Sequence, residues 1–144
     1  MFPIDLLDPL PDAVARHALL PLRIVLGVIM LDSGLGKWRR GIAGTGRWFE
    51  GLGLPAPHAL ACWVATVETV CGALLIVGLL TPFAAAAIAV NMTVAAWVQK
   101  TRVHAPFQGG DVQGYELDVI LAAAALTLAI AGAGPLSLDA WLSR

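Results

Sequence analysis

The sequence predicts an all-α integral membrane protein, a four-helix bundle whose spans run up, down, up and down. The first reason is composition, because the 144 residues are 58% hydrophobic and 13% charged, whereas soluble globular chains are about 45–50% apolar and about 25% charged. The second reason is that apolar residues gather in four stretches, each near the roughly 20 residues that a helix needs to cross a bilayer. Together these spans leave no room for a soluble domain.

The four predicted spans contain few strongly polar side chains. They cover residues 18–35, 59–80, 82–98 and 117–133. The second carries Glu68 as its single charge, the third is uncharged but contains Asn91, and the fourth is uncharged after Asp118. Only Thr81 and Pro82 join the second span to the third, which predicts a tight antiparallel hairpin, because proline suits a first helical position.

The segment before the first span differs from a secretory signal. Such a signal has a basic start and a small-residue cleavage site, but this segment contains Asp5, Asp8 and Asp12 together with several prolines. Its scattered Phe, Ile and Leu side chains predict a segment that lies at the membrane surface. We therefore divide the chain into an interfacial segment, 1–17, and a single transmembrane domain, 18–142.

The loops differ in charge, and this predicts their side of the membrane. Loops 37–58 and 99–116 share one face, and their Lys and Arg residues are Lys37, Arg39, Arg40, Arg47, Lys100 and Arg102. The other face carries only Arg16 and Arg144. Because short loops rich in Lys and Arg stay in the cytoplasm, we expect both loops to be cytoplasmic and both termini periplasmic, in a bacterial plasma (inner) membrane.

Several classes of binding site are disfavoured. A net charge of −1 offers no basic surface to nucleic acid. The glycines of segment 41–46 lack the preceding strand and the Gly-Lys-Ser/Thr that a phosphate loop needs. Cys62 and Cys71 lie about 13.5 Å apart on one helix, too far for a disulfide. We expect no metal site, because no Cys/His set has zinc spacing, and the histidines lie outside the spans, which argues against a bis-histidine haem.

Charged residues within a membrane span are costly and need partners. One face of the first span presents, at helical spacing, Arg23, Gly27, Met30, Gly34 and Lys37. Glu68 lies about 15 Å from the cytoplasmic end of its span, and Arg23 lies at a similar depth, so we expect the two to pair. The pair could be a structural ion pair that fixes helix register, or Glu68 could carry protons beside a bound quinone or substrate; a third alternative is no contact.

The fourth span adds polar groups nearer the cytoplasmic surface. Tyr115 and Asp118 share a face of small residues, which predicts that Asp118 points into the bundle. Lys37 is the expected partner of Asp118, whereas the partner of Asp32 stays open. The predicted polar core, which is also the candidate quinone or substrate site, consists of Arg23, Lys37, Glu68, Asn91, Tyr115 and Asp118.

Short motifs follow one another in a specific order from about residue 22 to residue 142. They are Arg23, Gly27, Gly34 and Lys37, then Phe49, Gly53 and Pro55, then Glu68-x3-Gly72…Leu75…Gly78, then Gly114-Tyr115-Glu116, and finally Gly134-Pro135-x-Ser137-Leu138-Asp139. In this order and spacing the chain resembles the DoxX family of small four-helix bacterial membrane proteins.

The resemblance implies a role in membrane redox chemistry. DoxX members resemble a small subunit of quinol oxidase and thiosulfate:quinone oxidoreductase systems. Their fold is expected to be similar to that of vitamin K epoxide reductase, but the chain lacks the paired cysteines of that enzyme, so thiol oxidation is not carried over.

We therefore expect a small multi-pass subunit of, or accessory to, a quinone-linked redox complex. Its expected partners are the lipid bilayer and other subunits, without nucleic acid. It would have no redox cofactor and no independent catalytic activity of its own. The alternative is a quinone-reactive oxidoreductase subunit that uses Glu68 and Arg23 at the bundle core.

Overall fold

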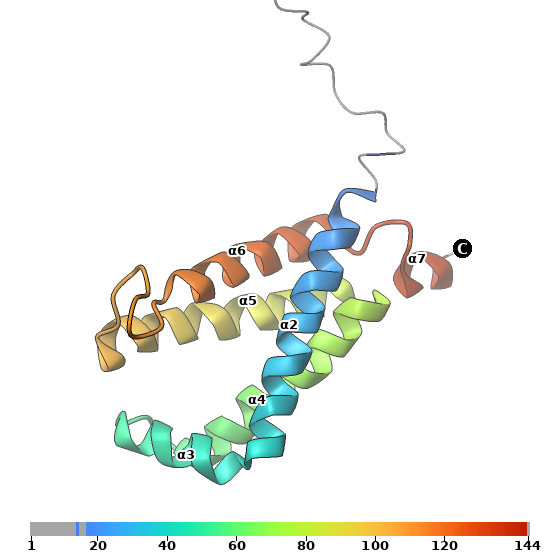
Figure 1. The fold of residues 1–144 in the computed structure, drawn as a ribbon. Helices are drawn as coiled ribbons and strands as arrows, with labels where there is room; N and C mark the ends of the chain where they lie inside the picture. Colours follow the sequence, from blue (N-terminus) through green and yellow to red (C-terminus); the bar gives the residue numbers. More distant parts are fainter. Residues whose placement is uncertain (1–13, 15–16, 144) are drawn as a thin grey trace, which may run out of the picture.

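The computed structural model describes residue 14 and residues 17–143, and the part of the chain that it describes contains helices and no strand (Figure 1). The helices are α2 (Leu19–Arg40), α3 (Ile42–Gly51), α4 (Pro57–Val77), α5 (Thr81–Val98), α6 (Glu116–Ala131) and α7 (Leu138–Leu142), with a π-helical turn, Gln99–Val103, directly after α5. The all-α prediction is confirmed. The predicted interfacial segment, 1–17, lies outside the described residues except for Val14 and His17.

Three helices are long and apolar enough to cross a membrane: Leu19–Arg40, Pro57–Val77 and Thr81–Val103. They correspond to the first three predicted spans. The fourth predicted span corresponds to α6, which has 16 residues and a length of about 24 Å. Large apolar side chains point outward along these helices; Phe83 is 76% exposed and Ile130 is 80% exposed. An apolar surface of this kind is typical of helices that face lipid.

The predicted hairpin between the second and third spans is present. Gly78 ends α4 with a φ of 70°, a left-handed conformation that glycine adopts without strain. α5 begins at Thr81, so Pro82 is the second helical residue rather than the first as predicted. Proline is tolerated there because its missing N–H would have no helical partner.

The crossing of α2 and α4 depends on small residues. A Cβ atom at Gly72 would lie 2.6 Å from the Leu31 nitrogen, and one at Gly34 would lie 2.6 Å from the Thr69 nitrogen. Gly27 faces Gly72 and Ile76 in the same way. Glycine therefore lets the two backbones approach closely, which is how helices pack in lipid, and these contacts fix the register of α2 against α4.

The four long helices are arranged as two pairs (Figure 1). α2 packs on α4, α5 packs beside α6, and the pairs meet near the α4–α5 turn and diverge away from it. The buried core lies where the pairs meet, and its fully buried large side chains are Leu26, Met30, Leu75, Ile88 and Leu128. α3 packs against α4 at the diverging end. The candidate site lies in the space between the two diverging helix pairs.

Candidate functional site

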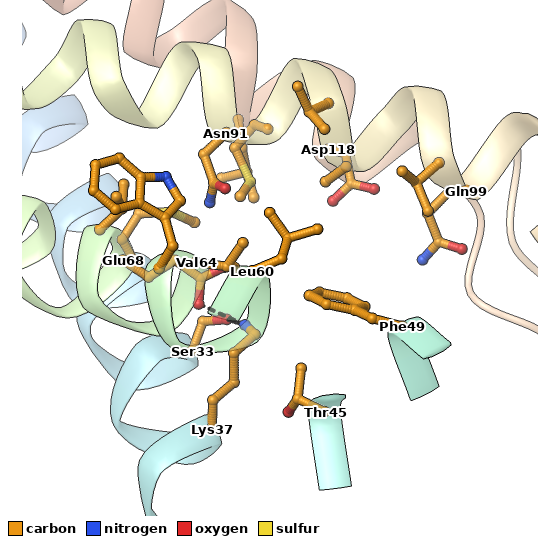
Figure 2. A pocket seen from close by; sticks show the side chains of 18 of the residues that line it. Ser33, Lys37, Thr45, Phe49, Leu60, Val64, Glu68, Asn91, Gln99 and Asp118 are labelled. Carbon is orange, nitrogen blue, oxygen red and sulfur yellow. Dashed lines mark hydrogen bonds and ion pairs between the residues drawn. The ribbon is translucent and has the colours of Figure 1, made fainter. Parts of the chain in front are cut away.

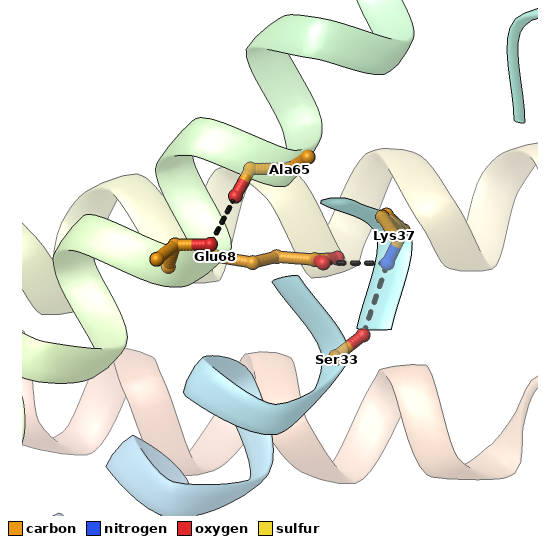
Figure 3. Close-up of polar contacts among 5 residues, drawn as sticks. Ser33, Lys37, Ala65 and Glu68 are labelled. Atoms are coloured by element: carbon orange, nitrogen blue, oxygen red, sulfur yellow. Dashed lines mark hydrogen bonds and ion pairs between the residues drawn. The ribbon is translucent and has the colours of Figure 1, made fainter. Parts of the chain in front are cut away.

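An ion pair between α2 and α4 forms one wall of the site (Figure 3). The Lys37 ammonium lies 2.5 Å from Glu68 Oε2 and also donates a hydrogen bond of 3.0 Å to Ser33 Oγ, one helical turn away on α2. The Glu68 side chain is 4% exposed and the Lys37 side chain is 19% exposed. The predicted burial of Glu68 is therefore confirmed.

Two polar side chains on the other helix pair face this wall (Figure 2). Asn91 comes from α5 and Asp118 from α6. Asn91 Nδ2 and Asp118 Oδ2 are buried, and neither has a hydrogen-bond partner among the described residues. Buried polar atoms are nearly always hydrogen-bonded, so each of these two atoms needs a partner that the described residues do not supply, such as water or a ligand.

A pocket of about 990 Å³ separates the two walls. It contacts both the ion pair and the two unpartnered side chains, and it is otherwise lined mainly by apolar groups. Phe49 and Thr45 on α3 border it on one side, and Gln99 lies toward the loop that follows α5 (Figure 2). A large apolar pocket with a few converging polar groups is the usual form of a small-molecule site.

The predicted pairing of Arg23 with Glu68 is wrong. The glycine contacts place Gly34 opposite Thr69 near the middle of α4, whereas Arg23 lies against Gly78 at the C-terminal end of α4. Gly78 is ten residues beyond Glu68, which is about 15 Å along a helix. The prediction matched depths by counting from the ends of the apolar stretches, whereas α2 continues to Arg40, which moves Lys37 into reach of Glu68.

Arg23 instead forms hydrogen bonds with the segment that follows α6. Its side chain is buried, Nη1 donates to the Ala133 carbonyl, and Nη2 donates to the Leu136 carbonyl oxygen at 2.7 Å. Asp139 also connects this segment to the start of α5, because its carboxylate accepts hydrogen bonds from the Leu80 and Thr81 amides at 2.7 and 2.9 Å. Arg23 is thus a structural residue of this end of the protein.

Asp139 lies outside the spans, and its hydrogen bonds alter its acidity. Burial on its own would raise the pKa of the Asp139 carboxyl, but the hydrogen bonds from the Thr81 and Leu80 backbone and the charge of Arg23 outweigh burial and lower the pKa. The two amides belong to the start of α5, where a negative charge is also favoured by the helix dipole.

The other predicted site residues divide between the pocket and its surroundings. Lys37 and Asp118 both line the pocket, but the Lys37 ammonium bonds Glu68 and Ser33 rather than Asp118. Tyr115 does not line it; the Tyr115 ring packs edge-on against Phe107, with centroids 5.2 Å apart. Asp32 lies on the exposed side of α2. The pocket therefore joins Lys37, Glu68, Asn91 and Asp118 from the predicted set, and excludes Arg23 and Tyr115.

The sequence profile of the DoxX family matches residues 18–101. This range includes the α2–α4 crossing and three of the four predicted residues that line the pocket. The chain belongs to the DoxX family. It is 32% identical over 131 residues to "Uncharacterized membrane protein Rv3486" of Mycobacterium tuberculosis, a match that covers 85% of this chain and 80% of that protein. It is 31% identical over 123 residues to "Putative oxidoreductase CatD" of Bacillus subtilis, with 85% of each chain covered. No solved structure matches.

Sequence reasoning missed the part that α3 plays in this DoxX pocket. The segment was expected to be part of the loop 37–58, but it is helical and buries Gly46 and Phe49. Ile42, Gly46 and Phe49 are spaced by four and three residues, a helical pattern that could have indicated a buried face. The glycines obscured it, although Gly46 packs directly against the His58 ring, where a larger side chain has no space.

Proposed function

We propose that this DoxX protein is the membrane-embedded subunit of a redox complex and that its pocket binds the head group of a quinone. The observation that carries the proposal is the pair of unpartnered polar atoms, Asn91 Nδ2 and Asp118 Oδ2, which share a pocket with the Lys37–Glu68 ion pair. The relative CatD bears the name of an oxidoreductase, which agrees with this role.

The chemistry of these side chains fits a quinone. A quinone has two carbonyl oxygens on opposite sides of a flat ring, and each needs a hydrogen-bond donor once it leaves water. Asn91 Nδ2 is a free donor on one wall, and the Lys37 ammonium is a donor on the other. The apolar side chains between them suit the ring, because such sites combine an apolar lining with a few polar groups that orient the ligand.

Reduction of a quinone to a quinol consumes two electrons and two protons. In our proposal the electrons come from a partner subunit, because this chain would carry no redox cofactor of its own. The protons come from the side chains of the pocket. The two donors are the Lys37 ammonium, which Glu68 holds in place, and Asp118 in its protonated form, and both regain their protons from the cytoplasmic water. Ionisable groups inside a membrane protein commonly mark proton relays of this kind.

We also propose that α6 is a fourth span and that the chain is a four-helix bundle. α6 lies beside α5 over most of its length (Figure 1), and its apolar sequence has no charge after Asp118. With four spans, the loops rich in Lys and Arg are cytoplasmic and both termini are periplasmic. The pocket then lies in the cytoplasmic half of the plasma membrane, at the end where the helix pairs diverge.

Quinone binding to the purified protein in lipid nanodiscs tests this proposal. Menadione and the dimethoxy-methyl-benzoquinone head group would be titrated against the native chain and against Asn91→Leu and Asp118→Leu. We expect each substitution to weaken binding about tenfold or more, the value of one lost hydrogen bond to a buried group. Thr93→Val is the matched control, because Thr93 lies on the exposed side of α5.

Binding by the native chain that both substitutions weaken, with Thr93→Val unchanged, supports the proposal. Absence of binding by the native chain to either head group contradicts it, and the protein is then an anchor for other subunits. Circular dichroism and the elution volume of each variant show whether it is folded.

A further inference from the structure

The edge of the pocket between α4 and α5 is apolar and exposed. Trp63 on α4 is 66% exposed, and Val90 and Val94 on α5 are 65% and 50% exposed. All three also line the pocket. We name these three residues the rim. Because α4 and α5 both face lipid along their outer sides, the rim lies where the pocket meets the acyl chains of the bilayer.

Polarity changes from the interior of the pocket to the rim. Glu68 and the unpartnered atoms of Asn91 and Asp118 are buried, whereas the rim has no charged residue. A small water-soluble ligand would form no polar contact with such an apolar edge. A molecule with a polar head and an apolar tail matches both parts, since its head can reach the buried donors while its tail stays among lipid chains.

A second edge of the pocket is polar. Arg40, Gln99 and Gln113 line it near the loops that we assign to the cytoplasm, and this edge is the route that a ligand would take from water. Phe49 lies between that edge and the ion pair and is 7% exposed (Figure 2). The volume of about 990 Å³ is near the upper end of the range for small-molecule sites, more than a single ring requires.

We infer that the ligand enters this pocket sideways from the bilayer, between α4 and α5, and that it carries an apolar tail which remains across the rim. The inference rests on the proposed function, because it names the ligand class as a membrane-dissolved quinone with a tail. Val90 is the residue that decides access. A larger side chain there would project into the opening, and its exposure leaves room for that side chain outside the core.

The first test asks whether lipid chains reach the pocket, and it needs no quinone. The protein is reconstituted with a phospholipid that carries a diazirine on its acyl chain, and photolabelled residues are mapped by mass spectrometry. We expect labels on Val64 and Val67, which line the pocket, and their loss to background in Val90→Trp. Val25→Trp is the matched control, because Val25 is 57% exposed and does not line the pocket.

The second test uses a menaquinone with a short isoprenoid tail beside tail-less menadione, with concentrations expressed per lipid. Val90→Trp should weaken binding of the tailed quinone about tenfold relative to Val25→Trp, while menadione changes by less than about twofold. Equal effects on both quinones, or none on either, overturn the inference, as does photolabelling that never reaches Val64 or Val67. If lipid chains reach the pocket but no quinone binds the native chain, the sideways opening stands and the proposed quinone function falls.

Discussion

Lys37 and Glu68 connect α2 to α4 through an ion pair of 2.5 Å, one helical turn from the contact of Gly34 with Thr69. The close approach of the backbones at Gly34 brings the two charges together. On the opposite wall, Asn91 Nδ2 and Asp118 Oδ2 have no hydrogen-bond partner among the described residues. The same crossing thus stabilises the helix pair and shapes the pocket.

Breaking this ion pair should destabilise the protein strongly. Glu68→Leu or Lys37→Met leaves one charge without its partner, which costs about 3–5 kcal/mol in buried pairs; we expect the lower end, because the Lys37 side chain is 19% exposed. The double variant should lose at least about 1 kcal/mol less than the sum of the single variants. Unfolding by SDS in mixed micelles measures these values. Additive losses would show that the two residues are not coupled.

Arg23→Ala should loosen the chain after α6 without affecting the pocket. The variant removes the hydrogen bonds to the Ala133 and Leu136 carbonyls, and bonds from charged donors are worth about 1.5–3 kcal/mol each. Hydrogen exchange of the Asp139 and Ala140 amides should become faster, because both are bonded in this segment. Arg39→Ala is the control on an exposed arginine of the same helix. Unchanged exchange in Arg23→Ala would refute the assigned role.

The contact of Asp139 with α5 should weaken in acid. The pKa of its carboxyl is lowered in the folded protein from an ordinary value of 3.8, so the native state favours the charged form. The stabilisation is therefore complete above that ordinary value and is lost as the pH falls through the lower, folded pKa. Exchange of the Leu80 and Thr81 amides, followed against pH, should show this loss. In Asp139→Asn the protection should be smaller and this pH dependence absent; an identical profile would contradict the assignment.

The proposed topology predicts the behaviour of reporter fusions. Alkaline phosphatase fused after Arg144 should be active, because it would lie in the periplasm, whereas a fusion after Gly110 should be inactive. Green fluorescent protein should give the reverse pattern at the two positions. Activity after Gly110 with none after Arg144 would invert the orientation and show that the loop charges are misleading.

Much of the fold follows from the sequence for physical reasons. The composition and the apolar stretches predict membrane helices, since a bilayer accepts few charges and requires every backbone group to be bonded internally. The burial of Glu68 follows from the same cost. Pairing partners are harder to predict, because they depend on the register between helices. That register is set by the contacts of Gly27, Gly34 and Gly72, which one sequence read alone does not reveal.

The candidate site was predictable in part. Lys37, Glu68, Asn91 and Asp118 were named because each is a polar residue in or beside an apolar stretch, and all four line the pocket. Arg23 was included for the same reason, but its partners are backbone carbonyls of the segment after α6, and carbonyls carry no signal in the sequence. The contribution of Phe49 was missed because glycines on both sides of it made α3 resemble a loop.

Photolabelling with an azido-quinone tests the central claim most directly, because it asks whether a quinone occupies this pocket in the intact protein. The native chain in nanodiscs is labelled, digested and analysed by mass spectrometry, with unlabelled quinone as competitor. We predict labelled peptides from α5 around Asn91 and from α4 around Glu68, suppressed by the competitor and by Asn91→Leu but not by Thr93→Val. Labelling confined to the outer lipid-facing sides of the helices, or unaffected by the competitor, would contradict the account.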